Sequence, residues 1–364
     1  MPQLRGSTNT SGFKATGEAA DDLAAVVESQ AANLKVTELV SVIIPAYNAA
    51  ETIDETLCSV RAQTWQALEV VVVDDGSQDD TALIAHRHAA VDPRVRVIEQ
   101  NNAGVAAARN RAISCTSGRY IAAIDADDLW ARNKIERQME VVYQRQRPPG
   151  LVYTWFCVID ANSVVRMREY RGVAEGSVLA QMCRRNIVGT GSNALMLRSA
   201  IEDVGGYDPS LRARNAQGSE DYDIYLRIAE RYDFAVVREY LTGYRELTGN
   251  MSSDVKQMIA SRDLCVSAVA ERHPHLLPEI ADGRRRFHRF MVARLTRQNR
   301  LAAAMQLFGH MLMESPTGTL SSLAELGRDR IHRRQQEHLN VGYNQRFEIG
   351  IPDTAATKSN AVES

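Results

Sequence analysis

The sequence lacks the patterns that define several common classes of protein. Its five cysteines are odd in number and widely spaced, with no C-x-x-C pair and no Cys/His cluster, so neither a disulfide framework nor a zinc site is indicated. No apolar run reaches the roughly 18 residues that a membrane helix needs, and no secretory signal is visible at the N-terminus. These absences favour a protein of the reducing cytoplasm.

Charge of one sign is not in excess either. Lys plus Arg number 43 and Asp plus Glu number 45, which gives a net charge of −2. This balance argues against binding driven by a strongly basic surface, and no nucleic-acid partner is expected. The composition is that of a globular protein, with 45% hydrophobic and 24% charged residues over 364 positions, enough to bury a substantial core.

Changes in composition and the positions of helix-breaking residues divide the sequence into parts. The first residues are polar and rich in Ala, Ser, Thr and Gly, which disfavours a packed core. The later part reads as mostly helical, with prolines as breaks. We expect four parts: a disordered extension (1–37), a main domain (38–253, with halves 38–130 and 131–253), a helical region (254–345) and a tail (346–364).

Short β-branched runs alternate with helical stretches in the first half of the main domain. Continuous apolar runs fit strands that are buried on both faces of a parallel sheet. The alternation predicts an α/β domain with a mostly parallel central sheet flanked by helices. The runs lie at 41–45, 69–73, 95–98 and 120–124, and the helical stretches at 51–63, 80–90, 105–114 and 131–146.

Polar residues follow each of these four runs. In open α/β sheets ligands bind beyond the carboxyl ends of the strands, so we expect the four loops to meet at one edge. Two of them are acidic. In chain order the loops carry Pro45-Ala46-Tyr47-Asn48, then Asp74-Asp75-Gly76-Ser77, then Asn101, Asn102 and Gly104, and finally Asp125-Ala126-Asp127-Asp128.

The loop from Asp125 to Asp128 gathers three carboxylates in four residues. Their mutual repulsion needs compensation, which a hard divalent cation such as Mg²⁺ or Mn²⁺ supplies. The alternative is a helix N-terminus capped by Asp127 or Asp128.

Asp74-Asp75 reads either as an acceptor for a nucleotide's base or ribose, or as a turn with Gly76 at positive φ. Neither a P-loop nor a dinucleotide fingerprint is present. Further along the chain, Glu220-Asp221 begins a predicted helix. Two interpretations are open: the acidic side chains stabilise the N-terminus of that helix, or one of them acts as a general base.

Taken in order, these motifs resemble those of family 2 glycosyltransferases, which are inverting enzymes with the GT-A fold. The resemblance covers roughly residues 39–252, and six motifs in order make it specific. The matching segments are Val40-Ser41-Val42-Ile43-Ile44-Pro45-Ala46-Tyr47-Asn48, Val73-Asp74-Asp75-Gly76-Ser77, Asn102-Ala103-Gly104 through Ala108-Arg109-Asn110, Ile124-Asp125-Ala126-Asp127-Asp128-Leu129-Trp130, Gly205-Gly206-Tyr207-Asp208 and Glu220-Asp221-Tyr222-Asp223.

The resemblance implies roles for these residues. Asp127 would be the principal ligand of a Mn²⁺ or Mg²⁺ ion, and Asp125 would approach the metal or the ribose. Asp128 would share metal or sugar contacts. Asp221 would be the catalytic base, with Glu220 as its neighbour and alternative. The donor-binding residues would be Pro45, Ala46, Tyr47, Asn48, Asp74, Asp75 (facing the base), Gly104, Arg109, Asp125 and Asp128.

The reaction implied is inverting transfer of a sugar from a nucleotide-sugar, a UDP-sugar above all, to a hydroxyl of a glycan or lipid-linked acceptor. The metal would stabilise the departing nucleoside diphosphate, and a carboxylate would take the acceptor proton. Two alternatives remain open: a sugar-phosphate nucleotidyltransferase, which would need a Gly-rich basic loop after the first strand, and a catalytically silent nucleotide-sugar-binding protein.

The sequence departs from the family pattern in one place. Family members often carry a His in a segment that here contains Tyr244-Arg245-Glu246-Leu247. Leu247 takes the His position and cannot bind a metal or a diphosphate. The expectation is therefore that this segment closes over the donor through Arg245 or Ser252, and that the cation depends more on Asp127.

The helical region contains an arginine-rich stretch at 284–300. A basic amphipathic helix can lie on an anionic membrane near a lipid-linked acceptor. The favoured interpretation is a helix packed on the catalytic domain with a solvated basic face. The expected location is thus cytoplasmic, with peripheral association at the inner face of the membrane as the second possibility, and the sequence indicates no oligomeric state. No partner spacing that indicates a metal site is found for His86, His88, His288, His310 and His332.

Overall fold

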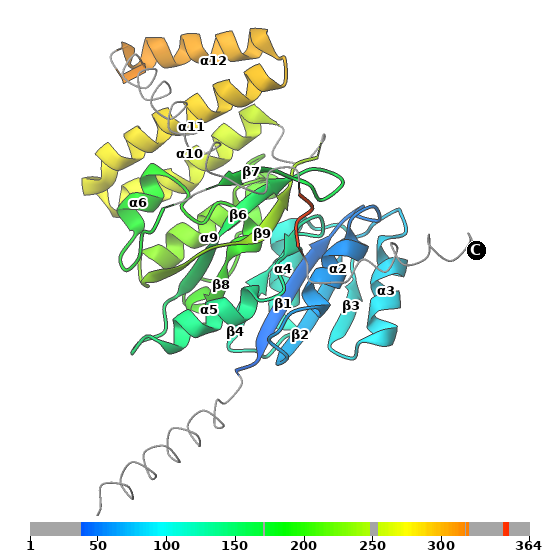
Figure 1. Cartoon of the computed structure of the whole chain (residues 1–364). Helices are drawn as coiled ribbons and strands as arrows, with labels where there is room; N and C mark the ends of the chain where they lie inside the picture. Colours follow the sequence, from blue (N-terminus) through cyan, green and yellow to red (C-terminus); the bar gives the residue numbers. More distant parts are fainter. Residues whose placement is uncertain (1–37, 170–171, 248–253, 317, 320–344, 349–364) are drawn as a thin grey trace, which may run out of the picture. The chain divides into compact units, whose positions relative to one another are not determined.

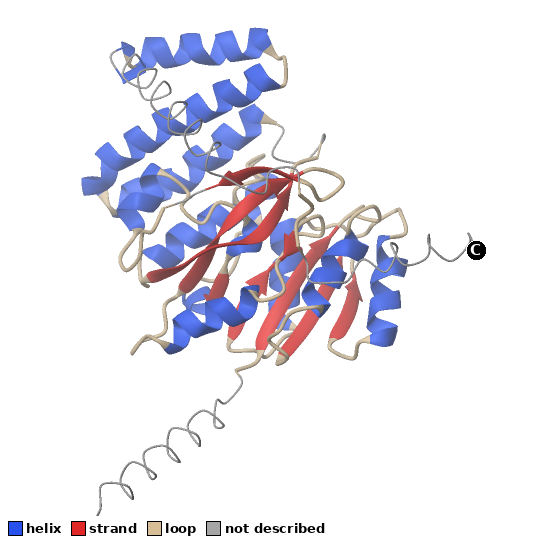
Figure 2. Cartoon of the chain, in the orientation of Figure 1, coloured by secondary structure: helices blue, strands red, loops and turns tan. Residues whose placement is uncertain are grey.

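The computed structural model describes residues 38–169, 172–247, 254–316, 318–319 and 345–348. The extension predicted for residues 1–37 lies outside them. From Leu39 onward the described residues belong to one compact unit. Figure 1 shows the order of the elements and Figure 2 their classes.

The first half of the unit alternates strand and helix, as predicted. The elements are β1 (Val40–Ala46), α2 (Ile53–Arg61), β2 (Leu68–Asp74), α3 (Thr81–Val91), β3 (Val95–Glu99), α4 (Val105–Ser114) and β4 (Tyr120–Ala123). β1, β2 and β4 are buried along nearly their whole length, and Val71, Val72 and Val73 are 0% exposed, whereas the edge strand β3 is buried only at Val95. Helices on both faces explain why these strands show no polar alternation.

The second half adds strands of mixed direction. Its elements are β5 (Leu129–Trp130), α5 (Lys134–Tyr143), β6 (Leu151–Ile159), β7 (Val165–Glu169), α6 (Leu179–Arg184), the 3₁₀ turn η1 (Gly191–Asn193), β8 (Leu195–Leu197), α7 (Arg198–Asp203), α8 (Ser210–Ala213), α9 (Glu220–Ala229) and β9 (Phe234–Arg245). Two of them, η1 and α9, reach the candidate site described below.

All strands join one sheet of order β3-β2-β1-β4-β8-β6-β9-β5, with β7 paired to β6. β1 pairs in parallel with β2 and β4, and β2 with β3. The predicted parallel arrangement is therefore confirmed for this half. Beyond β4 the sheet is mixed, because β8 runs antiparallel to both β4 and β6, while β6 and β9 are parallel. The regular alternation of strands and helices ends after β4, so the periodicity of the sequence did not predict the mixed strand directions.

The helical region predicted after the main domain contains α10 (Val255–Arg272), η3 (Pro274–Leu276), α11 (Leu277–Arg297) and α12 (Leu301–Glu314). These helices stack side by side in Figure 1, with α10 against α9 and α11 against α6. Within the described residues, no helix is both long and apolar enough to cross a membrane. Several arginines of α11 form ion pairs inside the unit, such as Arg284 with Asp263 at 3.1 Å.

Candidate active site

The loops that follow β1 and β2 are joined at the carboxyl edge of the sheet. The backbone N–H of Asp75 donates to the carbonyl of Ala46 at 2.8 Å. The N–H of Asn48 donates to Ser77 Oγ at 2.9 Å, and Asn48 Oδ1 accepts from the N–H of Gln78 at 2.8 Å. The expectation that these two loops meet is therefore confirmed.

The Asp75 carboxylate ties the loop after β2 to the loop after β3. Its Oδ1 accepts from Gln100 Nε2 at 2.7 Å and from the N–H of Ala103 at 2.8 Å, and its Oδ2 accepts from the N–H of Gly104 at 2.8 Å. Asp75 is 3% exposed. Three donors thus fix this carboxylate before any ligand binds.

The residues near Asp75 in the loops after β1 and β2 differ in exposure: some are buried and shape the backbone, and one faces solvent. Asp74 is buried and accepts from the N–H and the hydroxyl of Ser77, which closes the turn that Gly76 enters at a φ of 80°. Pro45 and Ala46 are buried as the end of β1. Tyr47, in contrast, is 52% exposed, so its ring is presented to solvent at the edge of the sheet.

The acidic loop between β4 and β5 is held from several sides. Thr52 and Thr56, at the start of α2, donate their hydroxyls to the carbonyl of Ala126 at 2.9 and 3.0 Å. Ser192 Oγ accepts from the N–H of Asp125 at 3.0 Å. The capping alternative for this loop is wrong, because Leu129 and Trp130 form a strand rather than a helix.

Asp128 is used inside the fold. It is 0% exposed; its Oδ2 accepts from Ser192 Oγ at 2.5 Å, and its Oδ1 accepts from the backbone N–H of Arg245 at 2.9 Å. Burial, together with the carboxylates of Asp127 and Asp125, raises the pKa of Asp128 well above its usual range. Both oxygens therefore have partners within the protein.

Asp127 differs from Asp128. Within the described part of the chain, the hydrogen bond that supports its ionised form comes from its own backbone N–H. Burial and the neighbouring Asp125 carboxylate raise the pKa of Asp127 to about 6, against the opposing effect of Arg245. This carboxylate is desolvated, repelled by a neighbour and open to a further partner, which is the chemistry of a cation ligand.

Arg109, on α4, lies beneath the acidic loop. Its Nη2 donates to Asp125 Oδ1 at 2.5 Å, and its guanidinium carbon lies 5.2 Å from the centroid of the Tyr207 ring. Arg109 is 4% exposed, while the side chain of Asp125 is 32% exposed. The structure thus brings the predicted Arg109 and Asp125 together, with Arg109 beneath the site and Asp125 at its surface.

Asp221, at the start of α9, faces the same arginine. Burial raises the pKa of Asp221 to about 7, although Arg109 and the N–H of Tyr222 favour its ionised form. Asp125 raises that pKa further, which places the carboxylates of Asp125 and Asp221 in one electrostatic neighbourhood. A carboxylate that titrates near neutral pH suits general base catalysis.

Glu220 is in a different position from Asp221. It is 5% exposed, and its Oε2 accepts from the backbone N–H of Gly218 at 2.9 Å. That hydrogen bond reaches back across the N-terminus of α9, so the side chain closes the turn that begins the helix. Asp221 is partly exposed at the start of the helix, whereas Glu220 is buried.

Sequence reasoning missed the residues that hold the acidic loop from the other half of the domain. Ser192 contacts both Asp125 and Asp128, and its carbonyl accepts from Trp130 Nε1 at 2.8 Å. A Cβ on Gly191 would lie 2.8 Å from Arg109 Nη2. The small residues at 189–192 could have indicated this contact, because a backbone segment can approach its neighbours closely only where its side chains are small.

Asn110 was quoted as part of a motif without a role. Its Nδ2 donates to the carbonyl of Tyr207 at 2.8 Å, and its Oδ1 accepts from the N–H of Tyr207 at 2.9 Å. A Cβ on Gly206 would lie 2.9 Å from that same oxygen. This reciprocal pair connects two of the six motifs and places Tyr207 under Arg109.

The expectation that Arg245 closes over the donor is wrong. Arg245 is 1% exposed, and its guanidinium donates to the carbonyl of Asp127 at 2.7 Å and to Glu55 Oε2 at 2.7 Å. The side chain points into the unit and supports the acidic loop from within. Leu247 is partly buried, and Ser252 lies outside the described residues.

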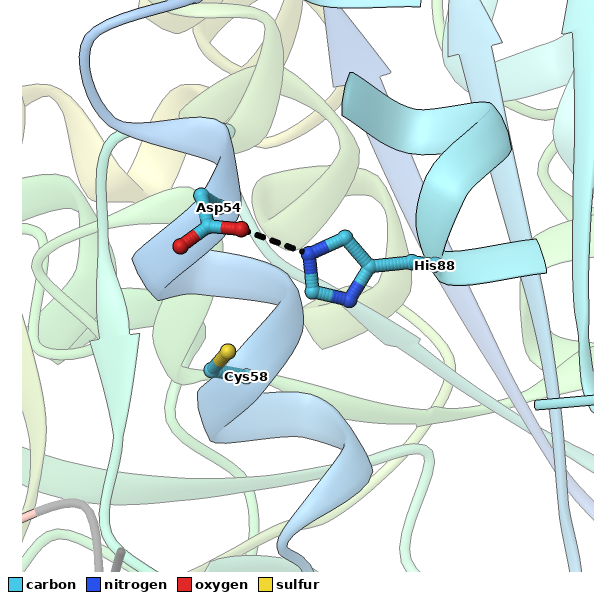
Figure 3. Close-up of side chains that lie close together, drawn as sticks. All are labelled: Asp54, Cys58 and His88. Carbon is cyan, nitrogen blue, oxygen red and sulfur yellow. Dashed lines mark hydrogen bonds and ion pairs between the residues drawn. The ribbon is translucent and has the colours of Figure 1, made fainter. Parts of the chain in front are cut away.

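A second cluster lies away from this site, between α2 and α3. Asp54, Cys58 and His88 bring one potential ligand atom each to within 4.8 Å of one another (Figure 3). Arg61 can only donate, so His88 Nδ1, 3.1 Å from Arg61 Nη1, is the acceptor. His88 Nε2 then carries the proton and donates to Asp54 Oδ1 at 3.0 Å. The bonds that join the two helices therefore occupy the nitrogen that a metal would need.

Solved structures resemble the chain in fold. The S. aureus TarS 1–349 structure in complex with UDP-GlcNAc matches with a TM-score of 0.55 and 17% identity, covering 74% of this chain and 80% of that one. Mannosyltransferase PcManGT from Pyrobaculum calidifontis, in complex with GDP-Man and Mn²⁺, matches with a TM-score of 0.51 and 20% identity, covering 86% and 90%. The fold is that of the GT-A-like glycosyltransferases.

The sequence comparison agrees with this fold. The profile described as Glycosyl transferase family 2 matches residues 41–205 of the chain, which is similar to that family over this segment. The chain is 42% identical over 108 residues to the putative teichuronic acid biosynthesis glycosyltransferase TuaG of Bacillus subtilis strain 168, covering 29% of this chain and 43% of the relative.

A second relative is the UDP-Glc:alpha-D-GlcNAc-diphosphoundecaprenol beta-1,3-glucosyltransferase WfgD of Escherichia coli. It is 38% identical over 128 residues, which is 35% of this chain and 49% of the relative. The chain thus spans less than half the length of these curated relatives.

Proposed function

We propose that this protein is a divalent-metal-dependent, inverting glycosyltransferase. It transfers a sugar from a nucleotide-sugar, a UDP-sugar, to a hydroxyl of a glycan or lipid-linked acceptor in polysaccharide or glycoconjugate biosynthesis. The observation that carries the proposal is that Arg109 faces both the Asp125 and the Asp221 carboxylates at the carboxyl edge of the sheet. The WfgD name, with its UDP-Glc donor and its lipid diphosphate acceptor, supports the substrate classes.

The nucleotide occupies the edge where the loops after β1, β2 and β3 meet. Pro45 and Ala46 end β1 beneath it, Tyr47 stacks from its exposed position, and Asn48 fixes the loop. Asp74 and Asp75 shape the turn after β2, and Gly104 lets the backbone approach closely at a φ of 92°. Because Asp75 already accepts three hydrogen bonds, a base that binds here meets an acceptor whose orientation is set beforehand.

The acidic loop holds the cation. Asp127 has carboxylate oxygens that are desolvated and open, and Asp125 lies beside it with part of its side chain exposed. Hard carboxylate oxygens suit Mn²⁺ or Mg²⁺, and the Mn²⁺ complex of PcManGT supports this choice. When bound, the cation supplies charge neutralisation for a departing nucleoside diphosphate. For Asp128 we propose a positioning role instead of donor contact.

Asp221 is the general base. Its carboxylate removes the proton from the acceptor hydroxyl that attacks the anomeric carbon, and a single displacement inverts that centre. Glu220 starts the helix that presents Asp221. Residues 131–253 then form the acceptor half of a catalytic domain, followed by the helical region 254–345, of which α10 and α11 pack on α9 and α6. The protein works in the cytoplasm or at the inner membrane face.

The experiment that tests this function is a panel of nucleotide-sugars with Mn²⁺ or Mg²⁺, scored by release of nucleoside diphosphate. A glycosyltransferase releases one diphosphate from one class of donor, and chelation of the metal stops the release. A sugar-phosphate nucleotidyltransferase instead forms pyrophosphate from a nucleoside triphosphate. Donor binding without release in the presence of extracts that contain acceptors contradicts the proposal and indicates a silent binding protein.

A further inference from the structure

The residues near the C-terminus contain a short segment that packs on the edge of the sheet. Gln345, Arg346, Phe347 and Glu348 are described, although the stretch before them is not. The N–H of Val165 donates to the carbonyl of Gln345 at 2.9 Å, and the N–H of Phe347 donates to the carbonyl of Ser163 at 2.8 Å. Arg346 forms an antiparallel bridge with Val164. We name residues 345–348 the docking segment.

An apolar contact runs from the docking segment to the strand that leaves the acidic loop. Phe347 is 7% exposed and forms a small core cluster with Leu129, Ile159 and two further side chains. A Cβ on Gly243 would lie 3.2 Å from Phe347 Cγ, so the ring lies flush against the backbone of β9. Leu129 follows Asp128 directly and pairs with Gly243. Phe347 therefore packs on the pair of strands that anchors the end of the acidic loop.

A polar contact runs from the docking segment to the same loop. Arg346 Nη2 donates to Glu55 Oε1 at 3.1 Å, and Glu55 Oε2 accepts from Arg245 Nη2 at 2.7 Å. Arg245 in turn donates its Nε–H to the carbonyl of Asp127 and its backbone N–H to Asp128 Oδ1. The Glu55 carboxylate thus links the docking segment to the Arg245 guanidinium, which supports the acidic loop from within.

We propose that the docking segment is a positioning element for the metal-binding loop: Phe347 and Arg346 hold Leu129 and Arg245 so that Asp125 and Asp127 meet a divalent cation in the productive arrangement. This inference rests on the proposed function and deepens it, because it assigns a role to residues that the sequence analysis placed in a tail. Groups that orient metal ligands affect metal affinity about 10- to 100-fold in other proteins.

The test compares the full-length chain with Phe347→Ala and Arg346→Ala. Free Mn²⁺ is titrated into each protein and followed by electron paramagnetic resonance, and hydrogen exchange is measured for the peptide that covers residues 125–130. We expect about a 10-fold loss of Mn²⁺ affinity in Phe347→Ala and a smaller loss in Arg346→Ala. Exchange at 125–130 becomes faster, while exchange in α3 is unchanged. Arg346→Lys keeps the charge and recovers most of the affinity.

Two matched controls separate positioning from general loss of stability. Phe287, on α11, is partly buried and packs against a different core cluster, and Arg272 pairs with Glu230 at 2.8 Å. Phe287→Ala and Arg272→Ala remove equivalent groups without a route to the acidic loop, so they leave Mn²⁺ affinity and exchange at 125–130 unchanged. Arg346 is 63% exposed, so Arg346→Ala remains informative if Phe347→Ala does not fold.

The outcomes distinguish this inference from the proposed function. If the wild-type chain binds Mn²⁺ and both docking variants bind it within about two-fold of that affinity, with unchanged exchange at 125–130, the positioning role is overturned. If the wild-type chain binds no divalent metal, the proposed metal dependence fails, and the exchange of residues 125–130 still decides whether the segment holds the loop.

Discussion

Arg109 Nη2 lies 2.5 Å from Asp125 Oδ1, at the bottom of the candidate site. The arginine is buried, and the carboxylate reaches the surface, so the pair fixes an acidic group at the site without consuming both of its oxygens. Its geometry depends on a glycine from the other half of the domain, since a Cβ on Gly191 would lie 2.8 Å from the same nitrogen.

Gly191→Ala displaces Arg109 and separates it from Asp125. Because Arg109 is buried, its guanidinium cannot move aside freely, and we expect transfer activity to fall about 10-fold or more. Nucleoside diphosphate release at saturating donor measures the effect. Gly309→Ala in α12 is the matched control, since its Cβ meets nothing within 4 Å, and it raises stability by about 0.5–1 kcal/mol. Wild-type activity in Gly191→Ala would show that the pair is not needed.

Asp221→Asn removes the proposed base while keeping the shape of the side chain. We expect the transfer rate to fall by about 10²- to 10⁴-fold, with donor binding by calorimetry unchanged. Glu220→Gln is the comparison. Because Glu220 closes a helix turn, we expect this variant to lower the unfolding temperature and to lower the transfer rate less than Asp221→Asn does. Transfer at nearly the wild-type rate in Asp221→Asn would remove Asp221 from the mechanism.

The pH profile follows from the same carboxyl group. A general base acts only when it is deprotonated, and the pKa of Asp221 is raised to about 7. The rate therefore falls as the pH drops below about 7 and levels off above it. The measurement is kcat/KM against pH for the wild-type chain, with metal saturating throughout. A profile that stays flat from the pKa of an ordinary Asp, about 3.9, up to neutral pH would contradict a perturbed base.

Asp127→Asn tests the proposed metal ligand. The carboxylate has no further donor among the described side chains, and its neighbour Asp125 repels it, so neutralisation removes a cation ligand while it relieves repulsion. We expect Mn²⁺ affinity to fall strongly while the unfolding temperature stays equal or rises. Ser192→Ala is the contrasting variant, because it leaves the buried Asp128 oxygen without its donor and costs about 1–3 kcal/mol of stability. If Asp127→Asn binds Mn²⁺ normally, another group holds the ion.

Tyr207→Phe separates the hydroxyl from the ring. Within the described part of the chain, the buried Tyr207 hydroxyl has no hydrogen-bond partner, while its ring packs under Arg109. Removal of an unpaired buried polar group does not destabilise a fold, so the unfolding temperature stays equal or rises. Tyr222→Phe is the control: its hydroxyl donates to the carbonyl of Met182 at 2.7 Å, and its loss costs about 1 kcal/mol. Thermal denaturation of both variants gives the comparison, and a destabilised Tyr207→Phe would show a partner for the hydroxyl.

Periodicity and motif order predicted the first half of the fold well. The valines of β2 and the acidic loop after β4 are recognised from residues next to them in the sequence. That local pattern is enough to predict a buried strand and the sheet edge at which the strand ends. The antiparallel insertion of β8 between β4 and β6 depends on contacts far apart in the chain, which no local pattern reports.

The candidate site divides in the same way. Asp75 and Asp125 were placed correctly at one edge because they follow predicted strands, whereas Arg109, inside a predicted helix, was named through the family resemblance alone. Ser192 and Asn110 were missed as supports, and Arg245 was assigned to the donor side although it is buried. Their roles come from hydrogen bonds such as that between Ser192 and Asp128, which are 64 residues apart. A residue type at one position does not reveal such a partner.

The arrangement around Arg245 also has a consequence for the order of folding. The bond from Arg245 to Glu55 spans 190 residues, and the bond from Arg245 to Asp127 spans 118. Closing such long loops is slow compared with local pairing. The β1–β4 half can form early, while the acidic loop gains its internal support only after β9 has been synthesised and has paired with β6. A chain still on the ribosome therefore carries the joined loops after β1 and β2 before it carries an organised acidic loop.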